Sequence, residues 1–375
     1  MSGKKEMKFS VDRETFLKPI QAVQGVVERR QTLPILANVL LSVHEGKLQV
    51  TATDMELELV ASAELPGAEG GDVTVPARKL GDICRALPAN AQIEFKLDGD
   101  RAIVRSGRSR FTLSTLSASE YPSTEQMEGD VRITVGQGAL KRLIELTHFA
   151  MAHQDVRYYL NGLLFEISAR RLRAVATDGH RLAIAELEIE AEIGEEPLSI
   201  IVPRKGVGEL MRLLSSEDDE VVLVVGSNAV QIELPDVRFT SKLIDGKFPD
   251  YDRVIPRAEE SDKQITVDRE SLRQTLARAS ILSNDKYRAI RLILDTNVLR
   301  VVANNPEQEE AEDEVAVDYE GESLEVGFNV SYLIDALGAL PGDTATVYLT
   351  DASSSCLITP EGEQDCRFVV MPMRL

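Results

Sequence analysis

The sequence contains no tryptophan, and its few phenylalanines and tyrosines make up 5% of the 375 residues. The hydrophobic cores must therefore rest on leucine, isoleucine, valine and alanine. Cysteine is also scarce: Cys84, Cys356 and Cys366 form no CxxC pair and no even set, which predicts reduced thiols in a cytoplasmic protein. No apolar run is long enough to cross a membrane, and the charged start MSGKKEM lacks the apolar segment of a signal peptide.

The sequence also lacks the motifs of common enzymes. No GxGxxG precedes a predicted helix, and no GxxxxGK[ST] occurs. Of the four histidines, His148 and His153 are five residues apart, which does not place them on one helix face as metal ligands. Asp178 and His180 in TDGHRL could orient a general base, but no nucleophile motif accompanies them, so a turn with local Asx bonding is favoured. The basic-free stretch 307–325 is interpreted as a solvated face. We predict no catalytic residue, no metal site and no cofactor.

The chain contains one sequence pattern that is repeated three times. FSVDRETFLKPI, ITVGQGALKRLI and ITVDRESLRQTL begin at Phe9, Ile133 and Ile265. Further matches follow in the same order: TATDMELEL (51–59) with VATDGHRLA (175–183) and loosely VANNPEQEE (302–310), then VTVPARKLGDICRAL (73–87) with IIVPRKGVGELMRLL (200–214) and VGFNVSYLIDALGAL (326–340). RFTLSTL (110–116), RFTSKLI (238–244) and RFVVMPM (367–373) close the three copies.

The repeated pattern predicts an α+β fold of three domains. Each copy shows two helices, with apolar residues at three- and four-residue spacing, among seven or eight strands with alternating apolar residues. Asp12 and Asp268 occupy predicted helix N-caps. The alternation suits antiparallel sheet with helices packed on one face. Pro-bearing polar links at 119–130 and 247–261 set the domains at 7–127, 128–258 and 259–375, which we call copies one, two and three.

Basic residues concentrate on or beside the predicted helices, although 62 acidic residues outnumber 42 basic ones and the net charge is −20. Spread evenly, this charge would repel nucleic acid. The clustered residues are Arg29, Arg30, Arg78, Lys79, Lys141, Arg142, Arg204, Lys205, Arg269, Arg273 and Arg278. Such a distribution suits a basic inner wall with an acidic exterior, although surface Lys and Arg are more often merely solubilising.

Long runs of the chain resemble one known family. These runs are MAHQDVRYYLNG (151–162), ATDGHRLA (176–183), VPRKGV, FTSKLIDGKFPDY, ARASILSNDKYR (277–288), ANNPEQEEAE (303–312), GFNVSY (327–332) and VVMPMRL (369–375). From Met7 to Leu375 the chain is similar to the bacterial sliding clamps, the beta subunit of DNA polymerase III holoenzyme. FPDYDRV places Asp252 beside Arg253, which is interpreted as a small departure that could change the charge at the rim of the groove described below.

The resemblance implies a ring-shaped homodimer whose helices line a channel around duplex DNA. Such a ring is a processivity factor in DNA replication and not an enzyme. It tethers the polymerase without sequence specificity and raises its effective concentration at the primer end. The implied partners are double-stranded DNA, the DNA polymerase III alpha subunit, the clamp-loader complex and other proteins with clamp-motif peptides, and the implied location is the cytoplasm, with no membrane contact.

The resemblance also assigns residues. DNA contact is expected from Arg30 (or Arg29, because the register around ERRQ is ambiguous), Gln154, Lys205, Arg204, Arg78, Tyr158 and Tyr159; the two tyrosines could stack on bases or pack beside the groove. A partner-peptide groove is expected from Leu160, Thr177, Gly179, His180, Arg181, Leu182, Pro249, Arg253, Val254, Ser355, Val369, Met371, Pro372, Met373 and Arg374. The dimer interface is expected to join Phe111 and Leu113 to Ile281 and Leu282, all four of which could instead be ordinary core.

Two alternatives remain at this point. The chain could be a repeat scaffold that binds short linear peptides and no DNA, or an enzyme acting through Asp178 and His180. Copy one keeps Thr53 and Asp54 of the shared TD frame but then has MELE where copy two has GHRL. This local departure is typical of a binding site grafted onto one repeat, and it favours the groove over plain interdomain packing.

Overall fold

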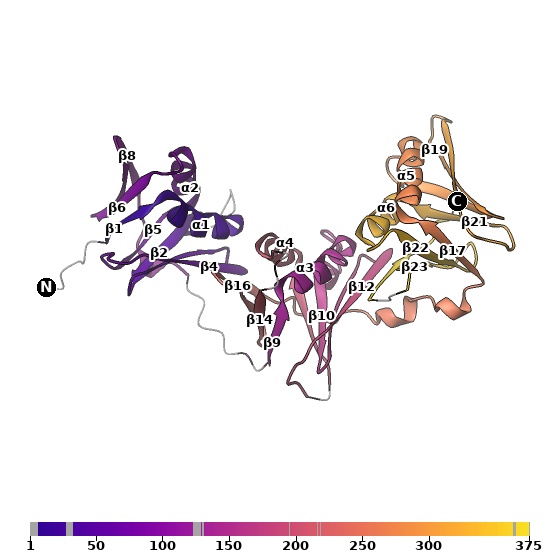
Figure 1. The fold of residues 1–375 in the computed structure, drawn as a ribbon, viewed down its shortest axis with the longest axis horizontal. Helices are drawn as coiled ribbons and strands as arrows, with labels where there is room; N and C mark the ends of the chain where they lie inside the picture. The colour runs from indigo at the N-terminus through magenta and orange to yellow at the C-terminus, as the bar shows by residue number, and fades with distance from the viewer. Residues whose placement is uncertain are drawn as a thin grey trace. The chain divides into compact units, whose positions relative to one another are not determined.

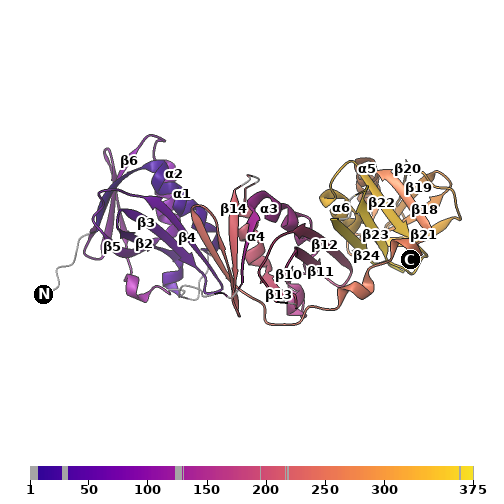
Figure 2. The same ribbon diagram turned by 60° about the horizontal axis from the view of Figure 1, so that its bottom comes forward.

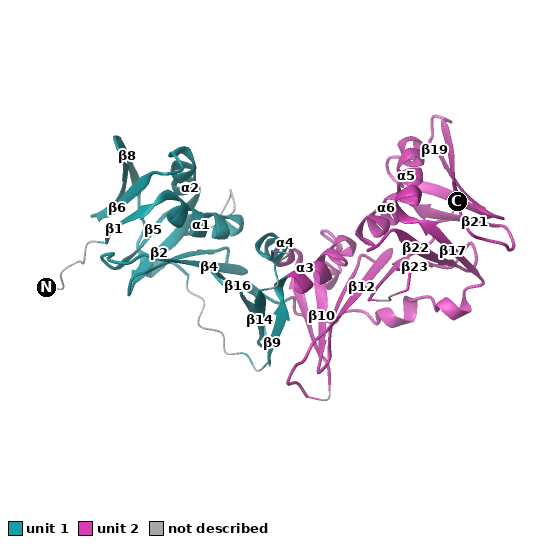
Figure 3. Ribbon diagram, in the orientation of Figure 1, with its two compact units in different colours: residues 1–137, 208–243 teal, residues 138–207, 244–375 magenta. Residues whose placement is uncertain are grey.

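The computed structural model describes residues 7–27, 33–122, 129, 131–194, 196–215, 217, 219–362 and 365–374. They form two compact units, shown in Figure 3: residues 1–137 with 208–243, and residues 138–207 with 244–375. Within the described residues each repeated segment contributes two α-helices and eight strands. All the sheet pairings are antiparallel, which confirms the predicted α+β class with antiparallel sheets.

The first unit carries a small and a large sheet (Figure 1). The small sheet has the order β1-β6-β7-β8, from β1 (Lys8–Asp12), β6 (Gln92–Asp98), β7 (Arg101–Ser106) and β8 (Ser109–Ser114). The large one has the order β5-β2-β3-β4-β16-β15-β14-β9, from β2 (Asn38–His44), β3 (Lys47–Thr53), β4 (Leu57–Glu64), β5 (Gly71–Pro76), β9 (Val131–Gly136), β14 (Glu220–Val225), β15 (Ala229–Glu233) and β16 (Val237–Lys242). Helix α1 (Arg13–Val23) packs on β3 and β4 and against α2 (Ala77–Ala86).

The second unit repeats this plan (Figure 2). Its large sheet has the order β13-β10-β11-β12-β24-β23-β22-β17, from β10 (Gly162–Ser168), β11 (Arg171–Thr177), β12 (Arg181–Glu188), β13 (Leu198–Pro203), β17 (Lys263–Asp268), β22 (Thr344–Leu349), β23 (Cys356–Pro360) and β24 (Cys366–Val370). Its small sheet has the order β20-β19-β18-β21, from β18 (Ala289–Asp295), β19 (Val298–Asn304), β20 (Glu310–Ala316) and β21 (Leu324–Asn329). Helix α5 (Arg269–Ala279) packs against α6 (Val330–Ala339), while α3 (Gln137–Glu145) and α4 (Arg204–Leu213) each start in one unit and end in the other.

The same contact begins the first helix of every copy. The backbone N–H at the first helical position donates to a carbonyl just before the strand that follows the second helix: Arg13 to Ala91 (2.9 Å), Gln137 to Asp219 (2.7 Å) and Arg269 to Asp343 (2.8 Å). The three hydrogen bonds show that the repeat seen in the sequence is also a repeat of structure.

In copies one and three, the arginine at this position binds the last turn of the second helix. Arg13 Nε donates to the Cys84 carbonyl at 2.8 Å, and Arg269 Nη1 donates to the Leu337 carbonyl at 3.1 Å. Carbonyls in the last turn of a helix have no intrahelical donor. These arginines supply one and add positive charge where the helix dipole is negative.

The helix caps follow the sequence. Asp12 Oδ1 accepts the Thr15 N–H at 2.9 Å, and Asp268 Oδ1 accepts the Ser271 N–H at 2.7 Å, so both predicted N-caps are confirmed. Hydrogen bonding from Thr15, first by its side chain and then by its backbone, lowers the pKa of Asp12. Because the folded pKa is the lower one, this stabilisation is present above the unfolded pKa and is lost as the pH falls.

The cores match the expected composition and hide the thiols. Aliphatic side chains dominate. In the first unit an aromatic cluster joins them, in which the Phe9 and Phe95 rings stack at 4.9 Å and Phe16 meets Phe9 edge-on at 5.6 Å. All three cysteines are buried and unpaired. Burial raises the pKa of Cys84 to about 11 and the pKa of Cys356 and of Cys366 to about 12, so the thiols stay protonated.

We predict that Asp12→Ala removes about 1 kcal/mol of local stability from α1, since the Thr15 N–H loses its acceptor. Amide exchange measured by mass spectrometry should accelerate about fivefold over 13–23, because about 1.4 kcal/mol corresponds to tenfold. Asp12→Asn, which also caps, is the matched control and should change exchange much less. Unchanged exchange in α1, or equal acceleration in α5, would contradict the prediction.

Candidate partner groove and DNA-contact residues

The candidate groove is built on the strand pair that joins copy two to copy three. On β12 and β24, Arg181 faces Val370 and Leu182 faces Val369. The chain beyond β24 stays attached, because the Met371 N–H donates to the His180 carbonyl at 2.9 Å and the Met373 N–H donates to the Gly327 carbonyl at 2.8 Å. The described part of the tail is therefore hydrogen-bonded to the residue before β12 and to β21.

A tight turn precedes β12. Thr177 Oγ1 donates to the Arg181 carbonyl at 2.6 Å and accepts the Gly179 N–H at 3.1 Å. Asp178 Oδ1 accepts the backbone N–H of His180 at 2.9 Å and of Arg181 at 3.0 Å. The Asp178 carboxylate thus serves the turn, as the Asx interpretation predicts. The His180 ring stacks on Tyr332 with centroids 6.4 Å apart.

Copy one contains the same turn with different side chains. Thr53 Oγ1 donates to the Leu57 carbonyl at 2.7 Å, and Asp54 Oδ1 accepts the Glu56 N–H at 2.9 Å. Met55 has φ +78°, close to the +88° of its counterpart Gly179. The two copies therefore share the backbone conformation of this turn and differ in the side chains that it carries.

Glycine at 179 leaves room for an arginine. A Cβ at Gly179 would lie 2.9 Å from Arg157 Nη1. Arg157 is fixed there because its Nη2 lies 2.8 Å from Asp155 Oδ2 and also donates to the Asp178 carbonyl at 3.1 Å. Hydrogen bonding from Arg157 lowers the pKa of Asp155 to about 2, so the ion pair persists throughout the neutral range.

A cavity of about 200 Å³ opens beside this turn. Nine predicted groove residues line it: Leu160, Thr177, Gly179, Arg181, Leu182, Pro249, Val254, Val369 and Met371. Its floor is buried apolar surface, with Leu160 and Val369 each 2% exposed, whereas Val254 at the rim is 43% exposed. Removing apolar surface from water at such a site stabilises a bound apolar side chain.

Six predicted groove residues are not among the residues that line this cavity. They are His180, Arg253, Ser355, Pro372, Met373 and Arg374. Arg253 is exposed, and its Nε lies 2.6 Å from Asp250 Oδ2. The sequence prediction missed three lining residues, Arg157, Asp250 and Tyr251, and placed Tyr159 with DNA or at the groove edge. Tyr251 had a signal, since it is an aromatic residue two positions after Pro249 in the link between copies two and three.

The expected DNA-contact residues lie on helix starts and on the 151–161 loop. Arg78 is exposed near the start of α2, and its Nη2 donates to the Val27 carbonyl at 3.1 Å. Arg204, exposed at the start of α4, donates from Nη1 to the Met151 carbonyl at 3.0 Å; Lys205 beside it is half-buried. Gln154 is exposed, and Tyr158 is 57% exposed and edge-on to Tyr159. Arg29 and Arg30 lie outside the described residues.

Two of the expected dimer residues lie on the edge strand β8, and two lie in a turn that contacts the edge strand β20. Phe111 is half-buried and Leu113 is 6% exposed on β8, the last strand of its sheet. Ile281 is 76% exposed and Leu282 half-buried in the 3₁₀ turn Ser280–Leu282 that follows α5. An isoleucine this exposed is a stronger interface candidate than the buried Leu113.

Comparison with known proteins identifies the family. Models of the DNA polymerase III beta subunit match most of the chain in order: the N-terminal domain at residues 7–125, the central domain at 134–250 and the C-terminal domain at 252–374. The chain belongs to the DNA polymerase III beta subunit family. The resemblance seen in the sequence is confirmed.

Relatives agree over their full length. The beta sliding clamp of Pseudomonas putida is 53% identical and that of Escherichia coli K12 is 51% identical, each over 98% of this chain and 100% of the relative. A crystal structure of the Pseudomonas aeruginosa sliding clamp bound to griselimycin has a TM-score of 0.94 at 51% identity, covering 98% of this chain and 100% of that one. The chain therefore functions as a DNA sliding clamp, a non-catalytic processivity factor in DNA replication, and the enzyme and non-DNA scaffold alternatives are not favoured.

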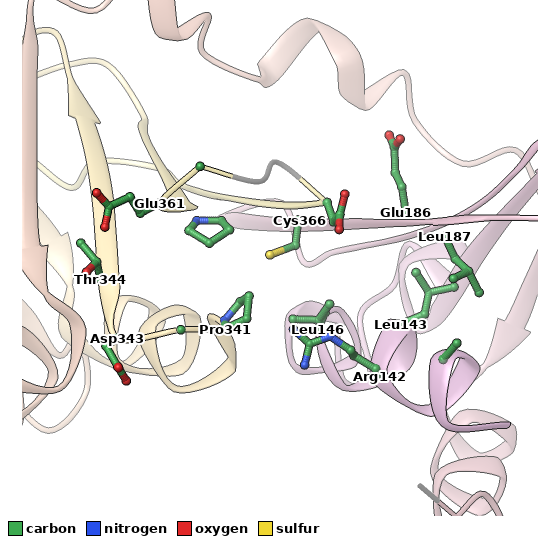
Figure 4. Close-up of a pocket in the computed structure, with 15 residues that line it drawn as sticks. Arg142, Leu143, Leu146, Glu186, Leu187, Pro341, Asp343, Thr344, Glu361 and Cys366 are labelled. Carbon is green, nitrogen blue, oxygen red and sulfur yellow. The ribbon is translucent and has the colours of Figure 1, made fainter. Parts of the chain in front are cut away.

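A larger cavity of about 720 Å³ lies at the other end of the β12–β24 pair (Figure 4). It is lined by Arg142 and Leu143 of α3, by the loop after α6 and by the β23–β24 hairpin with Cys366, and it contains none of the predicted groove residues. Its carboxylates Asp343, Glu361 and Asp365 are exposed to solvent, as a charged surface cleft requires.

No group of three or more His, Cys, Asp or Glu in the described ranges is arranged to hold a metal ion. Within the same ranges, no helix has the length and apolar character needed to span a membrane.

We predict that Gly179→Ala costs about 1 kcal/mol of stability, the usual penalty of a left-handed L-residue. Met55 shows that the turn tolerates a side chain, so the variant should fold. The melting temperature should fall by about 2 °C. Gly208→Ala is the matched control: its Cβ meets nothing within 4 Å, and in helix α4 it should stabilise by up to about 1 kcal/mol. A Gly179→Ala melting temperature at or above that of the wild type would refute the argument.

Proposed function

We propose that two copies of this chain close head to tail into a ring around duplex DNA and that partner peptides bind in the groove of copies two and three. The observation that carries the proposal is that one cavity gathers nine of the residues that the family resemblance assigns to the groove. The chain would then divide at 7–127, 128–258 and 259–375 into three clamp domains, which the three matched family spans support.

The two small sheets supply edges of opposite charge for ring closure. The β7–β8 hairpin carries Arg101, Arg105, Arg108 and Arg110, whereas β20 carries Glu310, Glu312, Asp313 and Glu314. In the single chain β8 and β20 each end their sheet, which leaves backbone donors and acceptors free for another strand. A basic edge that meets an acidic one favours head-to-tail over like-to-like pairing. Phe111, Leu113, Ile281 and Leu282 would lie at this contact.

The channel would face DNA with helices. Arg78, Arg204 and Lys205 at helix starts, with Gln154, Tyr158, Tyr159 and Arg30, would contact phosphates or bases without reading sequence. The net charge of −20 opposes tight binding, which suits a ring that must slide. Retention then comes from closure of the ring around the duplex and not from affinity for any one phosphate.

The groove would accept short peptides with leucine and phenylalanine anchors. Its apolar floor and charged rim match such ligands, and the methionine Met371 adapts to differing side chains. His180, Arg253, Ser355, Pro372, Met373 and Arg374 would contact the peptide beyond the cavity itself. The proposed partners are the DNA polymerase III alpha subunit, the clamp-loader complex and other proteins with clamp-motif peptides, all acting in the cytoplasm.

We predict that clamps loaded onto nicked circular DNA stay bound through gel filtration and leave when the circle is cut. Free wild-type protein should have a mass near twice that of the 41.3 kDa chain. Ile281→Asp should yield monomers that the circle does not retain, because it buries a charge at an apolar contact. Equal retention on linear and circular DNA would refute the ring.

Deleting residues 371–375 should abolish polymerase stimulation while the dimer persists. The deletion removes Met371 and the backbone contacts to His180 and Gly327, and we expect the affinity for a clamp-motif peptide to fall by about tenfold or more. Fluorescence anisotropy measures the affinity, and sedimentation measures the dimer. Monomers after the deletion would show that the tail serves assembly instead.

A further inference from the structure

A ladder of alternating charges crosses the sheet on the same face as the groove residues Thr177 and Leu182. Glu166 on β10 faces Arg173 on β11, and Arg173 faces Glu186 on β12. Arg173 lies 3.7 Å from Glu166 (Nη1 to Oε2) and 2.6 Å from Glu186 (Nη2 to Oε1). Arg367 of β24 continues the row, with Nη2 3.6 Å from Glu186 Oε1. We call these four residues the charge ladder. It runs from copy two into copy three.

One side chain of the link between copies is seated on this ladder. The Tyr251 hydroxyl donates to the Glu166 carboxylate and accepts from Arg173 Nη1 at 2.9 Å. The Arg173 guanidinium lies 6.0 Å from the Tyr251 ring centroid, and only 12% of the Arg173 side chain is exposed. Burial, and after it the Glu166 carboxylate, raises the pKa of Tyr251, so the phenol stays protonated and keeps donating.

The link itself has little else to hold it. Residues 245–254, which we call the linker wall, contribute Pro249, Asp250, Tyr251 and Val254 to the groove. The last backbone hydrogen bond before the linker wall joins the Ile244 N–H to the Ile201 carbonyl of the sheet. Among the described residues, no backbone hydrogen bond joins the linker wall to a strand. Phe248 adds buried apolar contact but no direction. The short hydrogen bonds of the Tyr251 hydroxyl, together with the longer Arg173–Asp252 ion pair (4.0 Å), are therefore the directional contacts that position the linker wall.

The first link is pinned in a comparable way. The Tyr121 hydroxyl accepts a hydrogen bond from the Thr53 N–H at 3.2 Å. The same hydroxyl lies 3.2 Å from the Asn38 and Thr51 carbonyls. There the partners are backbone groups. The link that borders the groove is pinned instead to charged side chains, which substitution can alter without changing the backbone.

We propose that Glu166 and Arg173 are positioning residues of the partner groove: through the Tyr251 hydroxyl they hold the linker wall at the distance from β12 and β24 that a peptide requires. The inference rests on the proposed peptide site. Neither residue lines the cavity, so Glu166 would act through Tyr251, and Arg173 would act through Tyr251 and through Asp252, whose Oδ1 lies 4.0 Å from Arg173 Nη1.

The test compares dimeric full-length variants for binding of a fluorescein-labelled peptide with leucine and phenylalanine anchors. Tyr251→Phe removes only the hydroxyl, and Glu166→Gln removes the charge that orients it. Each should weaken binding about tenfold through faster dissociation, the usual size of a lost hydrogen bond to a charged group. The double variant should bind no more weakly than either single variant, because both remove one contact. If the two substitutions acted instead through a general loss of stability, their effects on the peptide affinity would add.

Two further variants make the outcome decisive. Tyr319→Phe is the matched control, since it removes a buried phenol hydrogen bond to the Glu322 carbonyl (2.7 Å) away from the groove and should leave the affinity unchanged. Val254→Asp puts a charge into the groove itself. If Val254→Asp leaves binding intact, the groove assignment is wrong. If it abolishes binding while Tyr251→Phe and Glu166→Gln match the wild type, or if their effects simply add, the positioning role is wrong.

Discussion

Antiparallel pairing of strands from neighbouring repeats is the interaction on which the rest of the structure depends. The pairs β4–β16 and β12–β24 merge half-sheets of successive copies into continuous eight-stranded sheets. Five residue pairs are in register at each junction, so a copy cannot shift past its neighbour by one residue without turning its buried side chains outward. The junction is thus as specific as the interior of a domain. A binding site built across it inherits that precision.

The two junctions show how repetition and function are reconciled. Both keep a threonine–aspartate turn with the same hydrogen bonds and a residue in the left-handed region. Copy two then uses glycine where copy one has Met55, which admits Arg157 beside the turn. The two copies share the backbone of this turn, and a few side chains make the turn of copy two part of a groove. Stability and recognition therefore depend on different residues of the same segment.

The sequence predicted the features that local chemistry determines. The three-fold repeat, the two helices of each copy and the caps at Asp12 and Asp268 follow from spacing and residue type. Most groove residues came from resemblance, because Leu160, Pro249 and Val369 are far apart in sequence and only the folded sheet brings them together. Tyr251 and Arg157 were missed since their partners, Glu166 and Asp178, lie on other elements. Val369 and Met371 of the terminal segment line the cavity.

The buried thiols have a practical consequence. All three thiols are buried and stay protonated, so maleimide reagents should not modify Cys84, Cys356 or Cys366 while the fold is intact. A cysteine introduced on β8 and another on β20 would then be the only fast-reacting groups. Dyes attached there would convert opening and closing of the proposed ring into a change in energy transfer. The native sequence needs no prior removal of its own cysteines for such an experiment.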